Sequence, residues 1–250
     1  MTAVLYAIPA SHPCAVVERA LQLKDVPYRR VELIPVVHKL PQRLRFGAAS
    51  VPGVAFADGR RVSGSRAILR VLDERAPEPA LLPAERQARA RVERAEEWGD
   101  QVLQPLARRL VWAALRRMPG ATMSYSDGAK LPVPAPAARL SAPLIVRMAQ
   151  RVNGATDASV RADLIALPSH LARVDGWIAE GVLGDEAVNA ADLQIGSSLR
   201  LLLTLGDLEP VLDAHAGGGL ARRVFPDYPG GVAAGALPSA WLAASANDGH

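Results

Sequence analysis

The sequence lacks the features that mark several large protein classes. A single cysteine, Cys14, among 250 residues excludes an intramolecular disulfide and any metal site built from several cysteines, and it is typical of a protein from a reducing cytoplasm. No apolar run reaches the roughly 18 residues that a transmembrane helix needs, so no membrane partner is expected. Segment 1–6 has no basic residue before its apolar run, which indicates a strand rather than a signal peptide.

Signatures of metal and nucleotide binding are also missing. The histidines do not have the spacing of metal ligands; they are His12, His38, His170, His215 and His250. The sequence contains neither a phosphate-binding loop nor a dinucleotide fingerprint. We therefore expect no metal cofactor.

Positive charge is concentrated in the first third of the chain. Residues 1–80 carry 12 basic and 7 acidic residues, whereas residues 81–250 carry 17 and 18, so the net charge of +4 originates in the first segment. This distribution favours a small anionic ligand over a nucleic acid, which would need a broader basic surface. Half of the residues are hydrophobic, which excludes global disorder.

The first 80 residues alternate short strands and helices. Apolar patterning predicts four strands, at residues 3–7, 28–33, 54–56 and 61–63. A helix is predicted to begin at Pro13, where Ser11 is a preferred N-cap residue, and another is predicted over 65–75. Residues 38–46 are expected to form a short helix or an irregular segment. Asp58-Gly59 predicts a hairpin turn between the last two strands. The predicted order is βαβ followed by ββα.

Beyond a linker marked by Pro77, Pro79 and Pro83, the pattern becomes helical. A long helix is predicted over 84–118, kinked or broken at Pro105, followed by a long loop over 119–136. Further helices are predicted at residues 139–151, 159–180, 190–205, 209–216 and 219–224. The fold class is therefore α+β, with an α/β domain at residues 1–78, an all-α domain at 84–225 and an extended tail at 226–250.

Four local motifs follow one another in an order that resembles the glutathione S-transferase family. They are Ser11-His12-Pro13-Cys14, His38-Lys39-Leu40-Pro41, Val51-Pro52 and Ser65-Arg66-Ala67-Ile68. The resemblance covers the N-terminal domain and, more weakly, the helical remainder. It implies a thioredoxin-like N-terminal domain, a helical second domain, a homodimer and the detoxification of electrophiles.

Ser11 occupies the position of the thiol-activating hydroxyl in serine-type members of the family. A hydroxyl donor at a helix N-terminus stabilises a bound thiolate. The alternative is that Ser11 only caps the helix. Tyr6 offers a rival hydroxyl, but it lies within the first strand and is expected to be a core or edge aromatic.

The resemblance also assigns residues to ligand binding. His38 and Lys39 would meet the glycine carboxylate of glutathione, because a cation with donors suits a carboxylate. A cis Val51-Pro52 bond would turn the Val51 backbone towards the ligand's cysteinyl backbone. Ser65, aided by the charge of Arg66, would hold the γ-glutamyl carboxylate at a helix N-terminus.

Two positions depart from simple expectations. Gly64 stands where the family usually has an acidic residue for the γ-glutamyl ammonium, which leaves open a different thiol, a weakened glutathione site or an acid supplied from elsewhere. Cys14 is the second position of a C-x-x-C pair whose first position is serine, so dithiol exchange is disfavoured and a buried apolar role is expected.

The helical domain contains a predicted capping box at Asn189 and Asp192, which is a folding feature. Candidates for contact with an apolar substrate, with core packing as the alternative, are Trp98, Gln101, Leu106, Trp112 and Tyr125.

The first functional hypothesis is a cytoplasmic enzyme that activates glutathione or another small thiol for attack on a hydrophobic electrophile. The second is a non-catalytic ligand-binding or protein-interaction module on the same fold, and a redox enzyme using Cys14 is the third.

Overall fold

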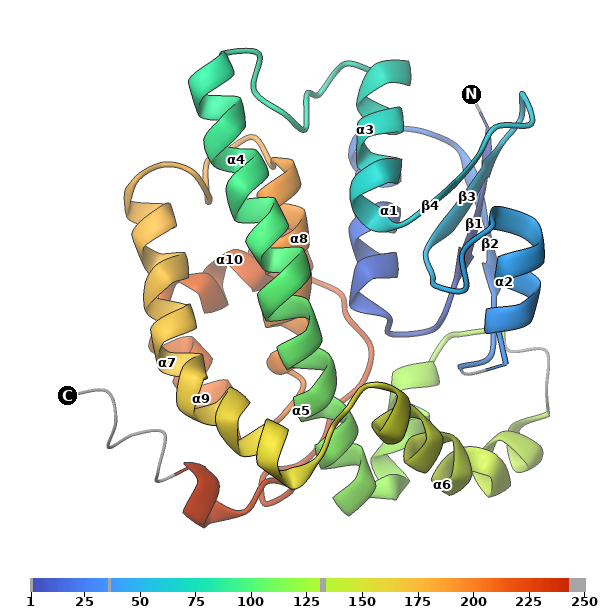
Figure 1. Cartoon of the computed structure of the whole chain (residues 1–250), viewed down its shortest axis with the longest axis vertical. Coiled ribbons are helices and arrows are strands. Elements are labelled where there is room, and N and C mark those ends of the chain that lie inside the picture. The colour runs from blue at the N-terminus through green and yellow to red at the C-terminus, as the bar shows by residue number, and fades with distance from the viewer. Residues whose placement is uncertain (1, 36, 131–133, 243–250) are drawn as a thin grey trace.

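The computed structural model describes residues 2–35, 37–130 and 134–242, and it consists of an α/β part packed beside a larger helical part (Figure 1). The α/β part contains a four-stranded sheet of order β2-β1-β3-β4. Its strands are β1 (Ala3–Ala7), β2 (Tyr28–Glu32), β3 (Gly53–Phe56) and β4 (Arg61–Ser63). β1 pairs in parallel with β2, and the other two pairings are antiparallel. The predicted βαβ and ββα order is confirmed.

Two helices cover the face of the sheet that meets the helical part, namely α1 (His12–Leu23) and α3 (Ser65–Arg75). They bury the apolar residues that their spacing predicts, among them Val17 and Leu21 in α1 and Ile68 and Leu72 in α3. The short helix α2 (Lys39–Phe46) lies on the opposite side (Figure 1). The buried side chains of β1 therefore pack against α1 and α3, and the site-forming loops lie at one end of this sandwich.

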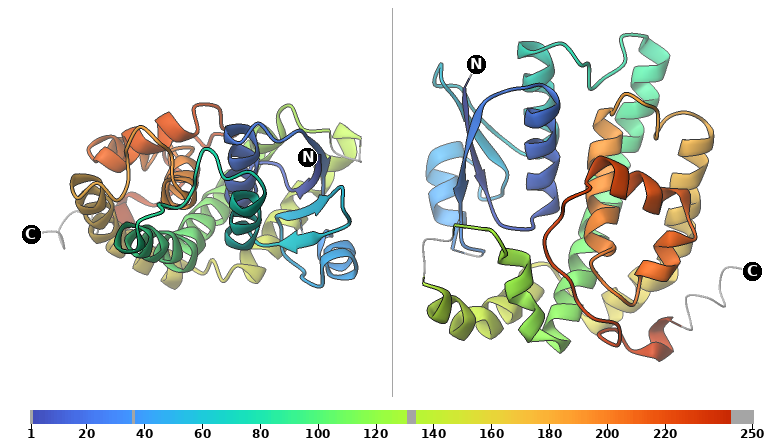
Figure 2. Two further views of the ribbon diagram at one scale, coloured as in Figure 1. Left: turned by 90° about the horizontal axis from the view of Figure 1, so that it is seen from above. Right: turned by 180° about the vertical axis from the view of Figure 1, so that it is seen from behind.

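The helical part begins after residue 85. Its helices are α4 (Arg86–Trp98), a π-helical segment η1 (Gly99–Leu103), α5 (Gln104–Arg117), a 3-10 helix η2 (Pro119–Ser126), α6 (Ala135–Val152), α7 (Asp157–Ala179), α8 (Ala190–Leu202), α9 (Glu209–Asp213) and α10 (Ala216–Val224). Figure 2 shows α8 enclosed between the α/β part and the outer helices. A thioredoxin-like domain followed by a helical domain confirms the predicted α+β class.

The long helix predicted over 84–118 is interrupted by η1, immediately before Pro105. Proline has no N–H for the i→i−4 bond, and the wider π-helical turn carries the chain past this missing donor into α5. At the start of η1, Gly99 allows α8 to approach, since a Cβ there would lie 2.8 Å from Cγ1 of Ile195. The predicted interruption at Pro105 is therefore confirmed as a π-helical segment.

The central helix α8 begins with the predicted capping box. The Asn189 Oδ1 atom accepts hydrogen bonds from the backbone N–H groups of Ala191 (2.8 Å) and Asp192 (3.0 Å), and Asp192 Oδ2 accepts one from Asn189 N–H (2.9 Å). The three backbone N–H groups lie at the helix start, where backbone donors have no partner within the helix. This prediction is confirmed.

The loop predicted over 119–136 is wrong in part, because η2 occupies residues 119–126 and α6 begins at Ala135. Proline is tolerated in the first turn of a helix, so Pro119 and Pro136 stand at helix starts rather than inside a loop; residues 131–133 lie outside the described part. The tail that follows residue 225 is described as far as residue 242. It is held by Val232, whose N–H donates to the Thr204 carbonyl (2.8 Å).

Among residues 2–35, 37–130 and 134–242, no helix combines the length and apolar character that crossing a bilayer requires.

Candidate active site

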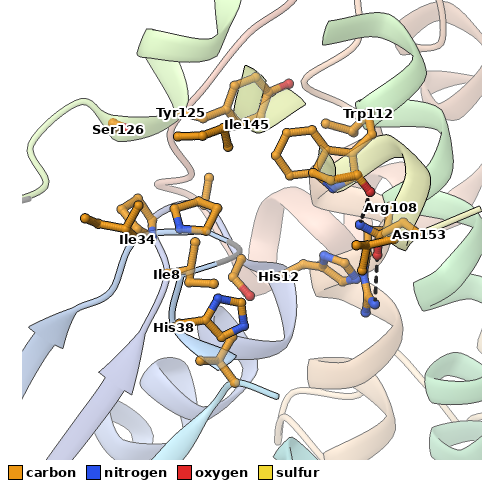
Figure 3. A pocket seen from close by; sticks show the side chains of 18 of the residues that line it. Ile8, His12, Ile34, His38, Arg108, Trp112, Tyr125, Ser126, Ile145 and Asn153 are labelled. Atoms are coloured by element: carbon orange, nitrogen blue, oxygen red, sulfur yellow. Dashed lines mark hydrogen bonds between the residues drawn. The ribbon is translucent and has the colours of Figure 1, made fainter. Parts of the chain in front are cut away.

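A cavity of about 1090 Å³ lies between the α/β part and the helical part. The loops that follow β1 and β2, the segment before β3 and the start of α3 form one wall, while α5, η2 and α6 form the other. Figure 3 shows Ile8, Ile34 and His38 on the first side, with Trp112, Tyr125 and Ile145 opposite. The cavity therefore combines polar groups at helix starts of the α/β part with a helical wall that carries both apolar and polar side chains.

Ser11 lines this cavity at the N-cap position of α1. Its carbonyl accepts the N–H groups of Cys14 and Ala15, both at 2.9 Å, so the backbone begins the helix. Its hydroxyl makes no capping hydrogen bond. The side chain is half-buried, so the structure leaves the hydroxyl beside the positive end of α1 without employing it as a cap.

Cys14 lies one turn further into α1 and is fully buried. Burial raises the pKa of its thiol to about 11, although a hydrogen bond with the Ser11 side chain acts in the opposite direction. A thiol with such a pKa remains protonated near neutral pH and is a poor nucleophile. This position therefore has the environment of a core residue, as the sequence predicted, and does not favour redox chemistry.

Tyr6 lies away from the cavity, on the α2 side of the sheet. Its ring packs edge-on against Phe46, with centroids 5.4 Å apart, and the Arg45 guanidinium lies 4.6 Å from its ring centroid. Arg45 also donates a hydrogen bond to the Tyr6 hydroxyl. Tyr6 is thus a half-buried aromatic on the central strand β1, neither in the core nor on an edge strand as expected, and its hydroxyl does not border the cavity.

His38 and Lys39 both line the cavity where α2 begins. Burial lowers the pKa of His38, so its imidazole is neutral near pH 7. Lys39 is exposed, and it forms no ion pair within the described residues. Of the two, Lys39 is therefore the group that supplies positive charge to the opening.

Val51 and Pro52 line the cavity directly before β3, and the peptide bond between them is cis, which confirms the predicted geometry. Gly53 follows, and a Cβ there would lie 2.7 Å from the Phe46 ring. The start of β3 is thus packed closely against α2 on one side and borders the cavity on the other.

Ser65 lines the cavity as the first residue of α3. Its hydroxyl donates a hydrogen bond to Gln194 Oε1 (3.1 Å), and Gln194 Nε2 donates to Asp100 Oδ1 (3.2 Å). Gly64, which precedes it, has φ +90° and provides no side-chain cap. The backbone N–H groups of the first turn of α3 therefore have no partner within the helix and border the cavity beside a carboxylate.

Arg66 points elsewhere. Its guanidinium lies 3.4 Å from Glu96 and 3.9 Å from Glu97. Arg66 is not among the described residues that line the cavity. The reason is tertiary: α4 packs beside α3 and brings two carboxylates within reach of this side chain. We therefore leave Arg66 out of the proposed site.

Sequence reasoning missed a row of polar side chains on the helical wall. Asp100, Gln104 and Arg108 follow one another at intervals of four residues and line the cavity. Gln104 Nε2 donates to Asp100 Oδ1 (3.0 Å), and Arg108 donates to Gln104 Oε1 (2.5 Å) and to Asn153 Oδ1 (3.5 Å). The sequence did contain a sign of this row: these polar residues lie on the same face of the predicted helix as Val111 and Leu115.

His12 was missed as well. It is buried beside Arg108 in the floor of the cavity (Figure 3). Burial lowers its pKa well below the usual value, and the charge of Arg108 lowers it further. Burial also lowers the pKa of Arg108, but a guanidinium remains charged near neutral pH. No carboxylate among the described residues forms an ion pair with Arg108, so its charge is available to an anionic group.

The candidates for contact with an apolar substrate divide into two groups. Trp112 and Tyr125 line the cavity. Trp98 instead packs against Trp177, Leu106 is a fully buried core residue, and Gln101 is exposed and donates to Glu97.

Residues 5–80 match the model of the glutathione S-transferase N-terminal domain family. The α/β part belongs to the glutathione S-transferase family. No curated protein matches the sequence, but solved structures of this family share its fold over nearly the whole chain. A glutathione transferase from Populus trichocarpa has a TM-score of 0.63 and 13% identity, with 99% of both chains covered.

Two bacterial structures are similar as well. A glutathione S-transferase from Rhodospirillum rubrum has a TM-score of 0.58 and 19% identity, covering 96% of this chain and 98% of the other. One from Methylobacterium radiotolerans, in complex with glutathione sulfonate, has a TM-score of 0.54 and 21% identity, covering 90% of each chain. At these identities the similarity shows the glutathione S-transferase fold of the helical part. No group of three or more metal-binding side chains occurs in the part of the chain that the structure describes.

Proposed function

We propose that the chain is a glutathione S-transferase-like enzyme that binds glutathione or an analogous small thiol against the α/β part and transfers it to an apolar electrophile. The observation that carries this proposal is the state of the Ser11 hydroxyl. It lies at the N-terminus of α1, borders the cavity and is not used as a helix cap. A donor in this position, beside the positive end of a helix, is suited to hold a thiolate.

The chemistry is nucleophilic substitution or addition. The thiol proton leaves to solvent, and the Ser11 hydroxyl donates a hydrogen bond to the remaining thiolate. A sulfur lone pair then forms the new S–C bond, while the leaving group departs with the electron pair of the bond that breaks. At an activated double bond, those electrons move instead to the acceptor group, which solvent protonates. Arg108 adds a positive charge that stabilises the thiolate and the developing negative charge.

The remaining ligand contacts follow the polar groups of the same wall. We assign Lys39, with His38 beside it, to the ligand's terminal carboxylate. The Val51 backbone, next to Pro52, is assigned to the ligand's cysteinyl backbone, and Ser65 to the γ-glutamyl carboxylate.

Gly64 offers no carboxylate to a ligand ammonium, but another carboxylate lies in the cavity. Asp100 is the one carboxylate among the described residues that line the cavity, and Gln194 connects it to Ser65. It is therefore the group available to a ligand ammonium. The apolar electrophile is assigned to the opposite wall, at Trp112 and Tyr125.

Thiol binding and turnover test the proposal in two steps. Glutathione and alternative low-molecular-weight thiols are first compared for their effect on the midpoint of thermal unfolding, because a ligand that binds only the folded state raises it. Conjugation of a chromogenic electrophile is then followed for the wild type and for Ser11→Ala. Stabilisation by a thiol together with Ser11-dependent conjugation is the expected result. No binding of any thiol would refute the assignment.

A second candidate is a non-catalytic thiol-binding or protein-interaction module on the same fold. It is favoured by Gly64, which offers no side chain at the position where the family resemblance implies an acid. Stabilisation by a thiol with no conjugation of any electrophile would support this candidate and contradict the enzyme.

We also propose, from the family resemblance alone, that the protein is a cytoplasmic homodimer. Light scattering of the purified chain in solution measures its mass directly. A mass of one chain at micromolar concentration contradicts the dimer.

A further inference from the structure

The exposed apolar side chains of the protein are concentrated around the opening of the cavity. Nine large hydrophobic residues are exposed within the described part, and seven of them lie on α6 or between residues 37 and 44. Those seven are Val37, Leu40, Leu44, Leu140, Leu144, Met148 and Val152. We refer to these seven residues as the rim, together with seven neighbouring cations: Lys39, Arg43, Arg45, Lys130, Arg139, Arg147 and Arg151. Such a concentration marks an interaction surface, since single exposed apolar residues are normally scattered.

The apolar residues of α6 form a continuous ridge. Leu140, Leu144, Met148 and Val152 are four residues apart, and Leu140 and Leu144 are 86% and 63% exposed. Residues spaced by four are neighbours on one face of a helix. The ridge therefore runs along the outer side of α6 and into the cavity opening, which Leu144, Met148 and Val152 also line.

A parallel ridge of α6 is basic. Arg139, Arg147 and Arg151 are exposed and form no ion pair with a carboxylate of the described residues. Residues 128–156 contain these arginines and Lys130 but no acidic residue. A helix with apolar and exclusively basic ridges side by side is typical of segments that lie on an anionic membrane surface.

The opposite edge of the opening repeats this composition. Leu40 and Leu44, both on α2, are 66% and 79% exposed. Residues 33–57 contain Lys39, Arg43 and Arg45 but no acidic residue. In Figure 1 and in the rear view of Figure 2, α2 and the start of α6 lie on the same side of the molecule, away from α10, and α6 ends beside the start of α7. Both edges therefore present leucines and cations from one side.

We propose that the rim docks on a membrane surface that contains anionic lipid. The leucines insert among the acyl chains at the headgroup boundary, and the lysine and arginine side chains reach the phosphates. The charge argues against a second copy of this chain, because two such faces would bring seven cations against seven. The absence of an aromatic stacking residue among the seven exposed hydrophobics argues against single-stranded nucleic acid. The sequence predicted no membrane partner because it lacks a spanning helix, and surface docking does not need one.

Docking would place the cavity opening against the lipid. Val37 and Leu144 belong both to the rim and to the cavity lining. An apolar molecule dissolved in the bilayer would then reach the cavity without crossing water. This consequence rests on the proposed enzyme, whereas docking itself does not.

The test measures binding of the intact protein to vesicles by flotation. Vesicles of phosphatidylcholine alone are compared with vesicles that contain phosphatidylglycerol. The protein is expected to float with the anionic vesicles only and to be released as the salt concentration rises, since salt screens the cations. Failure to float with anionic vesicles at low salt overturns the proposal.

Variants distinguish the rim from general positive charge. Leu40→Ser with Leu140→Ser removes two exposed side chains that do not line the cavity, and binding is expected to fall by about tenfold or more. The matched control is Ile165→Ser with Val211→Ser, which alters two exposed apolar residues outside the rim; its binding should be unchanged. Equal binding by the rim variant and the control overturns the proposal.

Charge variants complete the test. Arg139→Gln with Arg147→Gln is expected to weaken vesicle binding several-fold, while Arg86→Gln with Arg94→Gln, at exposed positions of α4, leaves it unchanged. Circular dichroism verifies that each variant is folded. If a soluble polyanion such as heparin binds as tightly as the vesicles, and binding does not depend on Leu40 and Leu140, the surface is a polyanion site and the membrane proposal is wrong.

Discussion

Replacing Ser11 with alanine separates the two roles that a serine at a helix start can have. If the hydroxyl caps α1, its loss costs about 0.5–2 kcal/mol of stability and leaves the thiol chemistry alone. The structure shows no such capping bond. The Ser11 side chain is instead hydrogen-bonded to the buried Cys14 thiol, which is a weak partner, so we expect the free energy of unfolding to fall by less than about 1 kcal/mol. If the hydroxyl instead donates to the bound thiolate, Ser11→Ala raises the pKa of the bound thiol.

The size of that shift follows from one hydrogen bond. A hydrogen bond to a charged group contributes about 1.5–3 kcal/mol, and one pKa unit corresponds to about 1.4 kcal/mol, so the pKa should rise by about 1–2 units. Below the pKa, the thiolate fraction falls about tenfold per unit. A more basic thiolate is more nucleophilic, with a Brønsted coefficient of about 0.4–0.5, which offsets about half of this loss. We therefore expect kcat/KM near neutral pH to fall by about three- to tenfold.

The assay is the pH profile of kcat/KM for conjugation of a chromogenic electrophile, together with denaturant unfolding of both proteins. Ser126→Ala is the matched control, because Ser126 lines the opposite wall of the same cavity. Its profile should match that of the wild type. An unchanged profile in Ser11→Ala, combined with a stability loss above about 1 kcal/mol, would show that Ser11 is only a cap and would refute the reasoning.

Three further perturbations test other parts of the structure. Lys39→Gln should weaken thiol binding by about three- to tenfold at low salt and by less at high salt, because Lys39 is exposed; titration calorimetry at two salt concentrations measures this, and equal affinities would contradict the role of Lys39. Burial raises the pKa of Cys14 from 9.0 to about 11, so the folded protein retains a proton that the unfolded chain loses, and stability should fall between about pH 9 and pH 11, by roughly 2–3 kcal/mol at most. Cys14→Ala should flatten this part of the stability profile, and an identical slope in both proteins would be inconsistent with the buried thiol. Gly230→Ala places a Cβ 2.3 Å from the Tyr125 ring at φ +101°, so it should destabilise the protein by about 1–3 kcal/mol, whereas Gly219→Ala, where a Cβ meets nothing within 4 Å, is the control in thermal unfolding.

Local patterns were sufficient to predict much of the fold. The strands, the hairpin at Asp58-Gly59 and the capping box at Asn189 and Asp192 depend on residues close together in the chain, and the structure contains all of them. The proline-rich segment 119–136 was misjudged because a proline at the first turn of a helix and a proline in a loop look the same in sequence. Only the packing of η2 and α6 against α5 decides between them.

The candidate site was less accessible to sequence reasoning. Ser11, Val51 and Ser65 are at element boundaries, so their positions could be predicted from the order of strands and helices. Arg66 and Arg108 could not be distinguished in this way. Arg66 lies against Glu96, whereas Arg108 faces the cavity. The surroundings of both side chains depend on how α4 and α5 cross the α/β part.

The most direct test of the central claim is the ultraviolet difference spectrum of the protein on titration with glutathione at neutral pH, repeated with the alternative thiols. Thiolate absorbance that grows with ligand and saturates in the wild type, and that is strongly reduced in Ser11→Ala at the same occupancy, is the predicted result. Occupancy is measured independently by calorimetry. Saturable binding without thiolate absorbance, or equal absorbance in both proteins, would contradict the claim that Ser11 holds a thiolate in this cavity.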